Sequence, residues 1–191
     1  MTVAEAPKTE DVLLEVAARA FRERGYEVAT LDEIASELGI SRPAILHHFG
    51  SKRELLDAIV RPYITAADDL LDEWAAQAPL TPQGQRRFLT ALVDLIAQHR
   101  DAAAIVSRDM TAHPQLAPDL RIEDRTNRYA LLIIDNHGGD RLAGVRGMGA
   151  LGVISRALVA PNDIVDFEDP EVRAVLVDAA LAALRSGRKR R

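Results

Sequence analysis

Apolar residues recur at helical spacing along the chain, and no segment keeps the strict alternation that marks a β-strand. The clearest case runs from Thr30 to Lys52, with the sequence TLDEIASELGISRPAILHHFGSK. Leu31, Ile34 and Leu38 fall on one face of a first helix, and a second short helix is predicted after the following glycine. Two short helices joined by such a turn indicate a helix-turn-helix unit.

Capping residues mark the ends of these helices. Thr30 and Glu33 stand three positions apart, so the hydroxyl and the carboxylate can each bind a free backbone amide at a helix start. Gly39 suits the left-handed backbone at a helix C-terminus, and Ser41 is a suitable N-cap for the next helix. Ser51 opens a third helix with a second capping box, since glutamate again follows three residues later. These signals favour a compact globular unit.

The remaining sequence also indicates helices with clear starts. A long apolar stripe follows Ser51 and contains Pro62, which predicts a kink or a restart near residues 58–62, because proline removes an amide donor and clashes with the preceding turn. That bend can act as a hinge or only wrap the helix around the core. Helix starts are predicted at Thr9, Thr81-Pro82, Asp101, Ala117-Pro118, Asp140 and Asp169-Pro170. The Asp101 helix is expected to reach Ala112, and the whole fold to be all-α with about nine helices.

The composition is that of an ordinary soluble protein, with 48% hydrophobic and 28% charged residues in a chain of 191. Cysteine is absent, which excludes disulfides and cysteine-ligated metal sites. The acidic start MTVAEAPKTED lacks the basic and apolar regions of a signal peptide, and no apolar run approaches the roughly 20 residues that span a bilayer. We therefore expect a cytoplasmic protein that has no membrane segment.

Motifs of catalysis are missing from the sequence. The five histidines form no metal-binding spacing, and no GxSxG motif, P-loop or dinucleotide-binding fingerprint is present. The glycine series GVRGMGALG has no strand before it, so it is not expected to form a phosphate-binding loop. An enzyme is therefore disfavoured, and neither a metal ion nor a cofactor is predicted.

Residues 9–60 resemble the N-terminal DNA-binding domain of TetR-family transcriptional regulators. The resemblance rests on the runs LLEVAARAFRERGYEVATLDEIA and ELGISRPAILHHFGSKRELLDAIV. The following residues have the types that the family's pattern requires: Leu14, Ala17, Phe21, Gly25, Tyr26, Thr30, Ile34, Ala35, Gly39, Ser41, Phe49, Lys52 and Leu55. The chain departs from the pattern at Leu46, where the family usually has a tyrosine that contacts a DNA phosphate. His47 or His48 can replace that contact.

The resemblance implies a DNA-binding transcriptional regulator with a three-helix head and a helical body. We expect a disordered leader at residues 1–8, a helix-turn-helix domain at 9–54, an effector-binding and dimerisation domain at 55–187, and a basic tail at 188–191. The last two helices are rich in glycine and alanine, and the family's usual homodimer interface is a four-helix bundle made by these helices. The alternative is that they bury the glycine face inside one chain.

Eight residues are predicted to contact DNA: Thr30, Ser41, Arg42, Pro43, Ala44, His47, His48 and Lys52. Arg42 can read guanine through two hydrogen bonds, whereas Ala44 can touch only a thymine methyl. Thr30 and Lys52 are better suited to phosphates. Residues 1–60 contain seven Lys or Arg and eleven Asp or Glu, so the segment lacks the usual basic character of a DNA binder. We therefore expect tight binding only as a dimer, with a steep dependence on salt.

An effector pocket is expected among the fourth to eighth helices. Its candidate lining combines aromatic with polar side chains, namely Trp74, Phe88, Met110, His113, Asn127 and Tyr129. The expected function is that of a repressor that an unidentified small molecule releases from a palindromic double-stranded DNA operator. The alternative is a helix-turn-helix protein without such an effector, acting as an architectural or partner-controlled binder. A cavity of mixed lining would favour the first, and a filled core the second.

Overall fold

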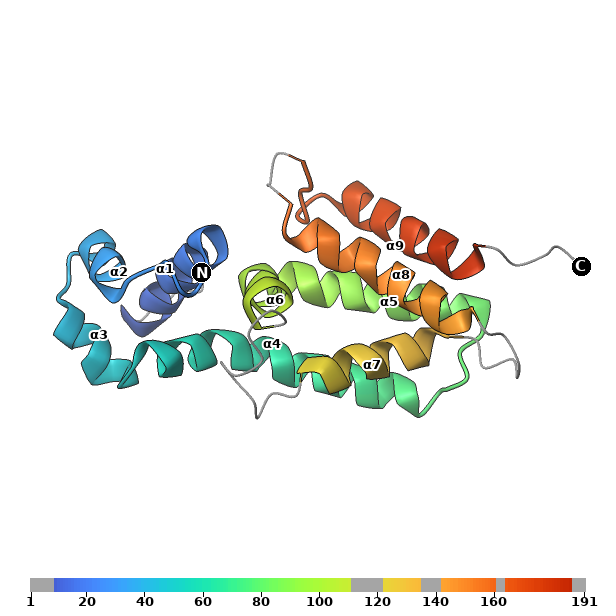
Figure 1. Ribbon diagram of the computed structural model, residues 1–191, viewed down its shortest axis with the longest axis horizontal. Helices are drawn as coiled ribbons and strands as arrows, with labels where there is room; N and C mark the ends of the chain where they lie inside the picture. The colour runs from blue at the N-terminus through green and yellow to red at the C-terminus, as the bar shows by residue number, and fades with distance from the viewer. Residues whose placement is uncertain (1–8, 111–121, 135–141, 161–163, 187–191) are drawn as a thin grey trace, which may run out of the picture.

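The computed structural model describes residues 9–110, 122–134, 142–160 and 164–186, and these ranges contain nine α-helices and no strand (Figure 1). The predicted all-α fold is therefore confirmed. No helix in the described ranges is long and apolar enough to cross a membrane. The predicted leader at 1–8 and basic tail at 188–191 lie outside the described residues. The helices are α1 (Thr9–Arg24), α2 (Leu31–Leu38), α3 (Arg42–Phe49), α4 (Lys52–Ala75), α5 (Pro82–Gln98), α6 (Arg100–Ile105), α7 (Ile122–Ile133), α8 (Ala143–Leu158) and α9 (Pro170–Arg185).

Helices α1 to α3 form a small head at one end of the molecule (Figure 1). The capping box of Thr30 and Glu33 is present, with both reciprocal hydrogen bonds at the start of α2. Gly39 follows α2 with a φ of 65°, the left-handed conformation that was predicted. Ser41 caps α3, and its hydroxyl accepts a hydrogen bond from the amide of Ala44. These local signals explain why two short helices meet at a fixed angle here.

Helix α4 connects the head to the body (Figure 1). Ser51 caps it by accepting from the amide of Glu54, while the Ser51 hydroxyl donates to the Glu54 carboxylate. Only half of the predicted second capping box is therefore formed with the backbone. The helix runs without interruption from Lys52 to Ala75, with Pro62 inside it and exposed. The predicted restart near Pro62 does not occur.

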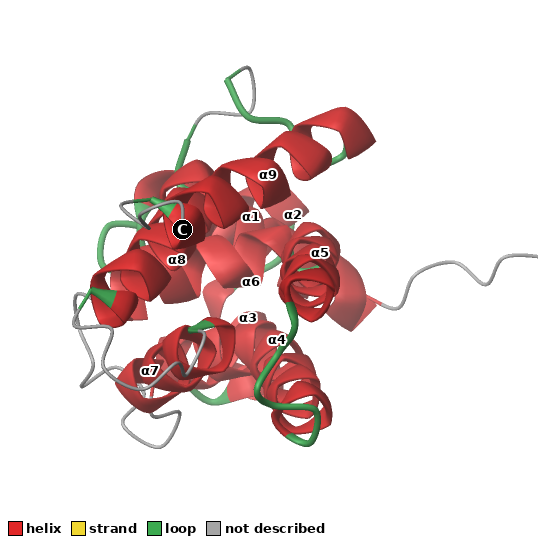
Figure 2. Ribbon diagram, turned by 90° about the vertical axis from the view of Figure 1, so that its right-hand side faces the viewer, coloured by secondary structure: helices red, strands yellow, loops and turns green. Residues whose placement is uncertain are grey.

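The body is a ring of helices. In order around the ring, α4 packs on α5, α5 on α9, α9 on α8, α8 on α7, and α7 on α4. Figure 2 shows this ring along the long axis of the molecule, with α6 on the side of the head. Thr81 and Asp169 cap α5 and α9, each followed by proline in the first turn, as predicted. The starts predicted at Ala117 and Asp140 lie outside the described residues.

One segment of the body differs from the prediction. Helix α6 ends at Ile105, and the chain continues as a single π-helical segment, η1 (Val106–Met110), where an α-helix to Ala112 was expected. The side chains of Arg108 and Asp109 in this segment bind the end of α1. In the wider π-helical turn both side chains face the head. Because these contacts are with a distant part of the chain, the local sequence does not predict them.

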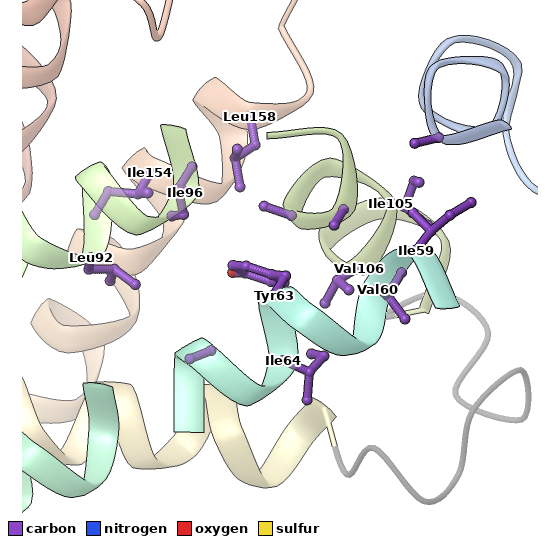
Figure 3. Close-up of a cluster of buried hydrophobic side chains, with 14 of the residues drawn as sticks. Ile59, Val60, Tyr63, Ile64, Leu92, Ile96, Ile105, Val106, Ile154 and Leu158 are labelled. Carbon is purple, nitrogen blue, oxygen red and sulfur yellow. The ribbon is translucent and has the colours of Figure 1, made fainter. Parts of the chain in front are cut away.

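A hydrophobic core extends through the head and the body. Its fully buried side chains include Phe21 and Ile45 in the head, Leu55 in α4, and Phe88 in α5. Figure 3 shows the part that joins α4 to its neighbours, where Tyr63 points from α4 toward Leu92 and Ile96 of α5. Close packing on both sides of α4 makes this helix the mechanical link between the two ends of the molecule.

Candidate nucleic-acid interface and body cavity

Helix α3 presents one polar side to solvent. Ile45 holds the helix to the core and is only 1% exposed, and Leu46 and Phe49 pack half-buried against the same core. Five of the predicted DNA-contacting residues of α3 and its cap are exposed, namely Ser41, Arg42, Pro43, His47 and His48. Ala44 is half-buried beside them. This face has the geometry of a recognition helix, although its contact with DNA stays a prediction.

Arg42 forms an ion pair with Asp32 at the start of α2, with 3.1 Å between its Nη1 and the Oδ2 of Asp32. Both side chains are more than half exposed, at 54% and 67%. Similar pairs join Arg24 to Glu33 across 3.1 Å and Arg19 to Glu37. Exposed pairs of this kind contribute about 0–1 kcal/mol each. Arg42 can therefore exchange Asp32 for a base or a phosphate at small cost.

Thr30 and Lys52 are committed to other contacts within the chain. The Thr30 hydroxyl lies 2.8 Å from the Glu33 carboxylate and accepts from the amide of the same residue. The Lys52 ammonium lies 4.5 Å from the ring centre of Tyr26 and donates to the carbonyl of Glu27 across 3.4 Å. Partial burial lowers the pKa of Lys52, an effect that nearby Glu27 and Glu33 oppose. Both side chains lie beside the head surface, but neither is as free as Arg42.

A cavity of about 310 Å³ lies inside the ring of body helices. Helices α4, α5, α6, α7 and α8 and the segment η1 all contribute to its wall. Most of the lining is apolar, including Ile64, Leu92, Ile96, Val106, Ile154 and Leu158, which Figure 3 labels around Tyr63. Polar atoms come from Tyr63, Ser107, Arg125, Thr126, Tyr129 and Ser155. A mixed lining of this size is typical of a small-molecule site.

The residues predicted to line an effector pocket are distributed in four ways. Tyr129 lines the cavity. Trp74 and Phe88 lie in the adjoining core with ring centres 5.7 Å apart, and Asn127 is exposed on α7. His113 and the side chain of Met110 lie outside the described residues. The two large aromatics form packing contacts because they fill the space between α4 and α5.

Sequence reasoning missed Arg125, which faces the cavity from α7. Its Nε and Nη2 donate to the two carboxylate oxygens of Asp68 on α4, across 2.7 and 2.5 Å. One turn further along α7, Arg128 pairs with Asp72, and the Tyr129 hydroxyl donates to the carbonyl of Ala67 across 3.2 Å. A usable signal was the position of Arg125 four residues before Tyr129, on the face of α7 that turns inward.

The segment η1 contacts both the cavity and the head. Val106 and Ser107 line the cavity. The next residue, Arg108, donates from Nη2 and Nη1 to the carbonyls of Phe21 and Arg22 at the end of α1, each across 2.8 Å. Asp109 accepts from the amide of Tyr26 across 3.1 Å. A guanidinium on the last carbonyls of a helix also matches the negative end of its dipole.

Residues 13–59, which include α2 and α3, match the sequence model of the bacterial regulatory proteins of the tetR family. The probable transcriptional regulator ArpR of Pseudomonas putida is 32% identical over 144 residues, which cover 74% of this chain and 67% of ArpR. The chain belongs to the TetR family.

Two further proteins are similar to this chain, one in sequence over part of its length and one in fold. The transcriptional activator FasR of Mycolicibacterium smegmatis is 32% identical over 58% of this chain, which spans about half of FasR, 51% of its length. The solved structure of the ketosteroid transcriptional regulator KstR2 of Mycobacterium tuberculosis has a TM-score of 0.73, with 20% identity over 97% of this chain and 98% of that chain. The latter likeness shows the fold. These relatives are named transcriptional regulators, which agrees with the expectation that the chain is not an enzyme.

In this TetR-family chain the two C-terminal helices pack on each other and leave an apolar surface uncovered. Leu142 and Val145 at the α8 side and Val175 on α9 are more than half exposed, whereas the half-exposed Met148 lines the cavity. One glycine of the series supports the alternative that the glycine face is buried inside the chain. A Cβ on Gly147 would lie 2.9 Å from Ile134, so this glycine allows close packing of α8, whereas Gly152 lines the cavity.

Proposed function

We propose that this protein is a homodimeric DNA-binding repressor that leaves a palindromic operator when a small molecule fills the body cavity. The observation that carries the proposal is the continuity of η1, whose Val106 and Ser107 line the cavity while Arg108 and Asp109 hold α1. One short segment would therefore connect the proposed ligand site to the head. The presence of the cavity favours this function over a binder without an effector.

The head would bind DNA through the exposed side of α3. Arg42, at the N-terminal end of the helix, would read guanine after leaving Asp32, and Ala44 would touch a thymine methyl. His47 and His48 would contact the backbone in place of the family tyrosine, since the half-buried Leu46 has no polar group to offer. A single head would bind weakly because residues 1–60 contain more Asp and Glu than Lys and Arg, so tight binding would require two heads on one operator.

Dimerisation would use the uncovered face of α8 and α9. Leu142, Val145 and Val175 at these helices are exposed apolar side chains that a second chain would cover. Val145→Asp is expected to give a monomer in sedimentation equilibrium. Leu131→Asp is the matched control, because Leu131 on α7 is equally exposed, at 71%, but lies outside the two helices. Equal behaviour of the two variants would argue against this interface.

Ligand release would work through linked equilibria. A ligand that pushes on Val106 and Ser107 favours a state in which Arg108 no longer fits the end of α1, so the two heads change their separation. A hinge at Pro62 in α4 is a second route for the same movement. Among the relatives, FasR is named an activator and KstR2 a repressor, so the family name alone does not fix the sign.

The test is selection of bound duplexes from a random pool by the purified full chain. The proposal expects enrichment of an inverted repeat whose half-sites lie one helical turn apart or a multiple of it, about 10 base pairs per turn. An enriched site without two-fold symmetry would contradict the homodimer. A pool without enrichment would contradict sequence-specific binding altogether.

A further inference from the structure

The cavity contains hydrogen-bond donors that the protein does not use. Nη1 of Arg125 is buried and has no hydrogen-bond partner in the described part of the chain. The Tyr63 hydroxyl, from α4, likewise forms no hydrogen bond within the described ranges. A buried donor without a partner, such as Nη1 of Arg125, carries a desolvation cost that a bound acceptor relieves. The two groups therefore indicate what kind of atom a ligand brings.

The charge of the cavity is already balanced. Arg125 is the only charged residue among the described residues that line it, and Asp68 holds that charge through two hydrogen bonds. A carboxylate or phosphate on the ligand would compete with Asp68 or remain as an uncompensated buried charge. No carboxylate is among the described residues that line the cavity, so an ammonium would find no ion-pair partner there. The cavity therefore disfavours ions of either sign.

Two polar groups of the lining have no hydrogen-bond partner in the described ranges, and both can donate, while the hydroxyls of Ser107, Thr126 and Ser155 can donate or accept. The guanidinium has no acceptor atom, and it offers Nη1 only. Burial raises the pKa of Tyr63 to about 12, so its hydroxyl keeps its proton at neutral pH and can donate. Tyr129 uses its own proton on the carbonyl of Ala67. A ligand oxygen that accepts, such as that of a ketone, gives these two donors a partner, whereas a group that only donates, such as an ammonium, leaves both without one.

We propose that the cavity binds a neutral, largely apolar small molecule whose carbonyl oxygen accepts a hydrogen bond from Arg125 or Tyr63. The apolar remainder packs against side chains such as Ile64, Leu92 and Leu158. The inference takes its regulatory meaning from the proposed function, but its chemical content concerns binding alone. It can therefore be tested on the full chain without DNA.

The experiment is a calorimetric titration with probes that share one chain length and differ in their head group. A graded series of medium-chain methyl ketones supplies the neutral acceptor, and the fatty carboxylate and fatty amine of equal length supply the two charges. The ketone is expected to bind saturably and about tenfold or more tighter than either ion. A carboxylate that binds as tightly as the ketone overturns the proposal, and so does the absence of saturable binding across the ketone series.

Two substitutions separate the contributions of hydrogen bonding and charge. Tyr63→Phe removes only the hydroxyl, which has no partner in the described ranges, so it should weaken ketone binding several-fold and leave the unfolding midpoint unchanged if Tyr63 is the donor. Asp68→Asn leaves the charge of Arg125 uncompensated and should turn the preference toward the carboxylate. Asp72→Asn is its matched control, because Asp72 pairs with Arg128 outside the lining. An unchanged preference in Asp68→Asn overturns the charge argument.

Failure of the proposed function gives a different result. If the ketone binds but the affinity for the selected duplex stays the same, ligand-controlled release is wrong and the ligand class stands. If duplex affinity responds to the carboxylate and not to the ketone, release stands and the ligand class is wrong.

Discussion

The head and the body use the same ion pair, arginine with aspartate, for opposite purposes. In the head, Arg42 meets Asp32 through one contact at 3.1 Å, with both side chains more than half exposed. In the body, Arg125 meets Asp68 through two contacts, and its side chain is only 16% exposed. Water competes for the first pair and barely reaches the guanidinium of the second. The first is suited to exchange its partner for DNA, and the second to fix the charge of a cavity.

Among the substitutions that test this comparison, Asp68→Ala is expected to have the largest effect on the free energy of unfolding. The substitution leaves the charge of Arg125 without its two acceptors, and we expect the free energy of unfolding to fall by about 2 kcal/mol, reduced from the fully buried case because Asp68 is 36% exposed. Urea unfolding measures the change. Asp72→Ala on the same helix is the control, since its 72% exposed side chain should cost less than about 0.5 kcal/mol. Equal losses would remove the distinction between the two kinds of pair.

Arg42→Ala addresses the other half of the comparison. We expect the affinity for the selected duplex to fall by about 1–3 kcal/mol, because the contact to guanine that we propose for Arg42 would be lost. Stability should change by less than about 0.5 kcal/mol, since the side chain is exposed. A fluorescence-anisotropy titration at fixed salt measures the affinity. Arg61→Ala, a similarly exposed arginine on α4, is the control and should leave it unchanged.

A third contrast concerns the contact between head and body. Arg108→Ala removes two hydrogen bonds to the end of α1, and we expect the last turn of α1 to open more easily by about 1 kcal/mol. Hydrogen exchange of the backbone amides of α1 should be several-fold faster, while that of α9 stays as in the natural chain. Unchanged exchange in α1 would show that η1 does not hold the head.

The smallest expected effect is that of Asp32→Asn. This change keeps the size of the side chain, removes a negative charge next to the DNA-facing surface and weakens the hold on Arg42. Duplex affinity should rise by about 0.5 kcal/mol, and the gain should shrink at high salt. The same anisotropy titration at two salt concentrations measures it. A lower affinity would indicate that Asp32 orients Arg42 for base reading.

The head was predictable from sequence because its signals are local. Thr30, Gly39 and Ser41 each determine one helix end through bonds to residues no more than four positions away. The exposed side of α3 follows from the burial of Ile45 between those ends. Helix propensity and capping residues were enough to predict these helix ends, because the packing of the folded head keeps the same ends.

The cavity was less accessible from sequence, for a physical reason. Its wall combines residues from α4 to α8, and the two side chains whose donors have no partner, Tyr63 and Arg125, are far apart in the sequence and line one cavity only in the folded ring. Trp74 and Phe88 were predicted to line it on composition alone, and they fill the neighbouring core. The η1 segment was predicted to be α-helical from its local sequence. Its π-helical form goes with contacts to α1, more than eighty residues earlier, which no local pattern shows.

The most direct test of the account places three chains side by side in one titration of the selected duplex: the natural sequence, Arg42→Ala and Asp32→Asn. The account predicts changes of opposite sign, with weaker binding for Arg42→Ala and slightly tighter binding for Asp32→Asn. Weaker binding for both would show that the pair is a fixed part of the head, and no change in either would show that α3 does not read DNA through Arg42.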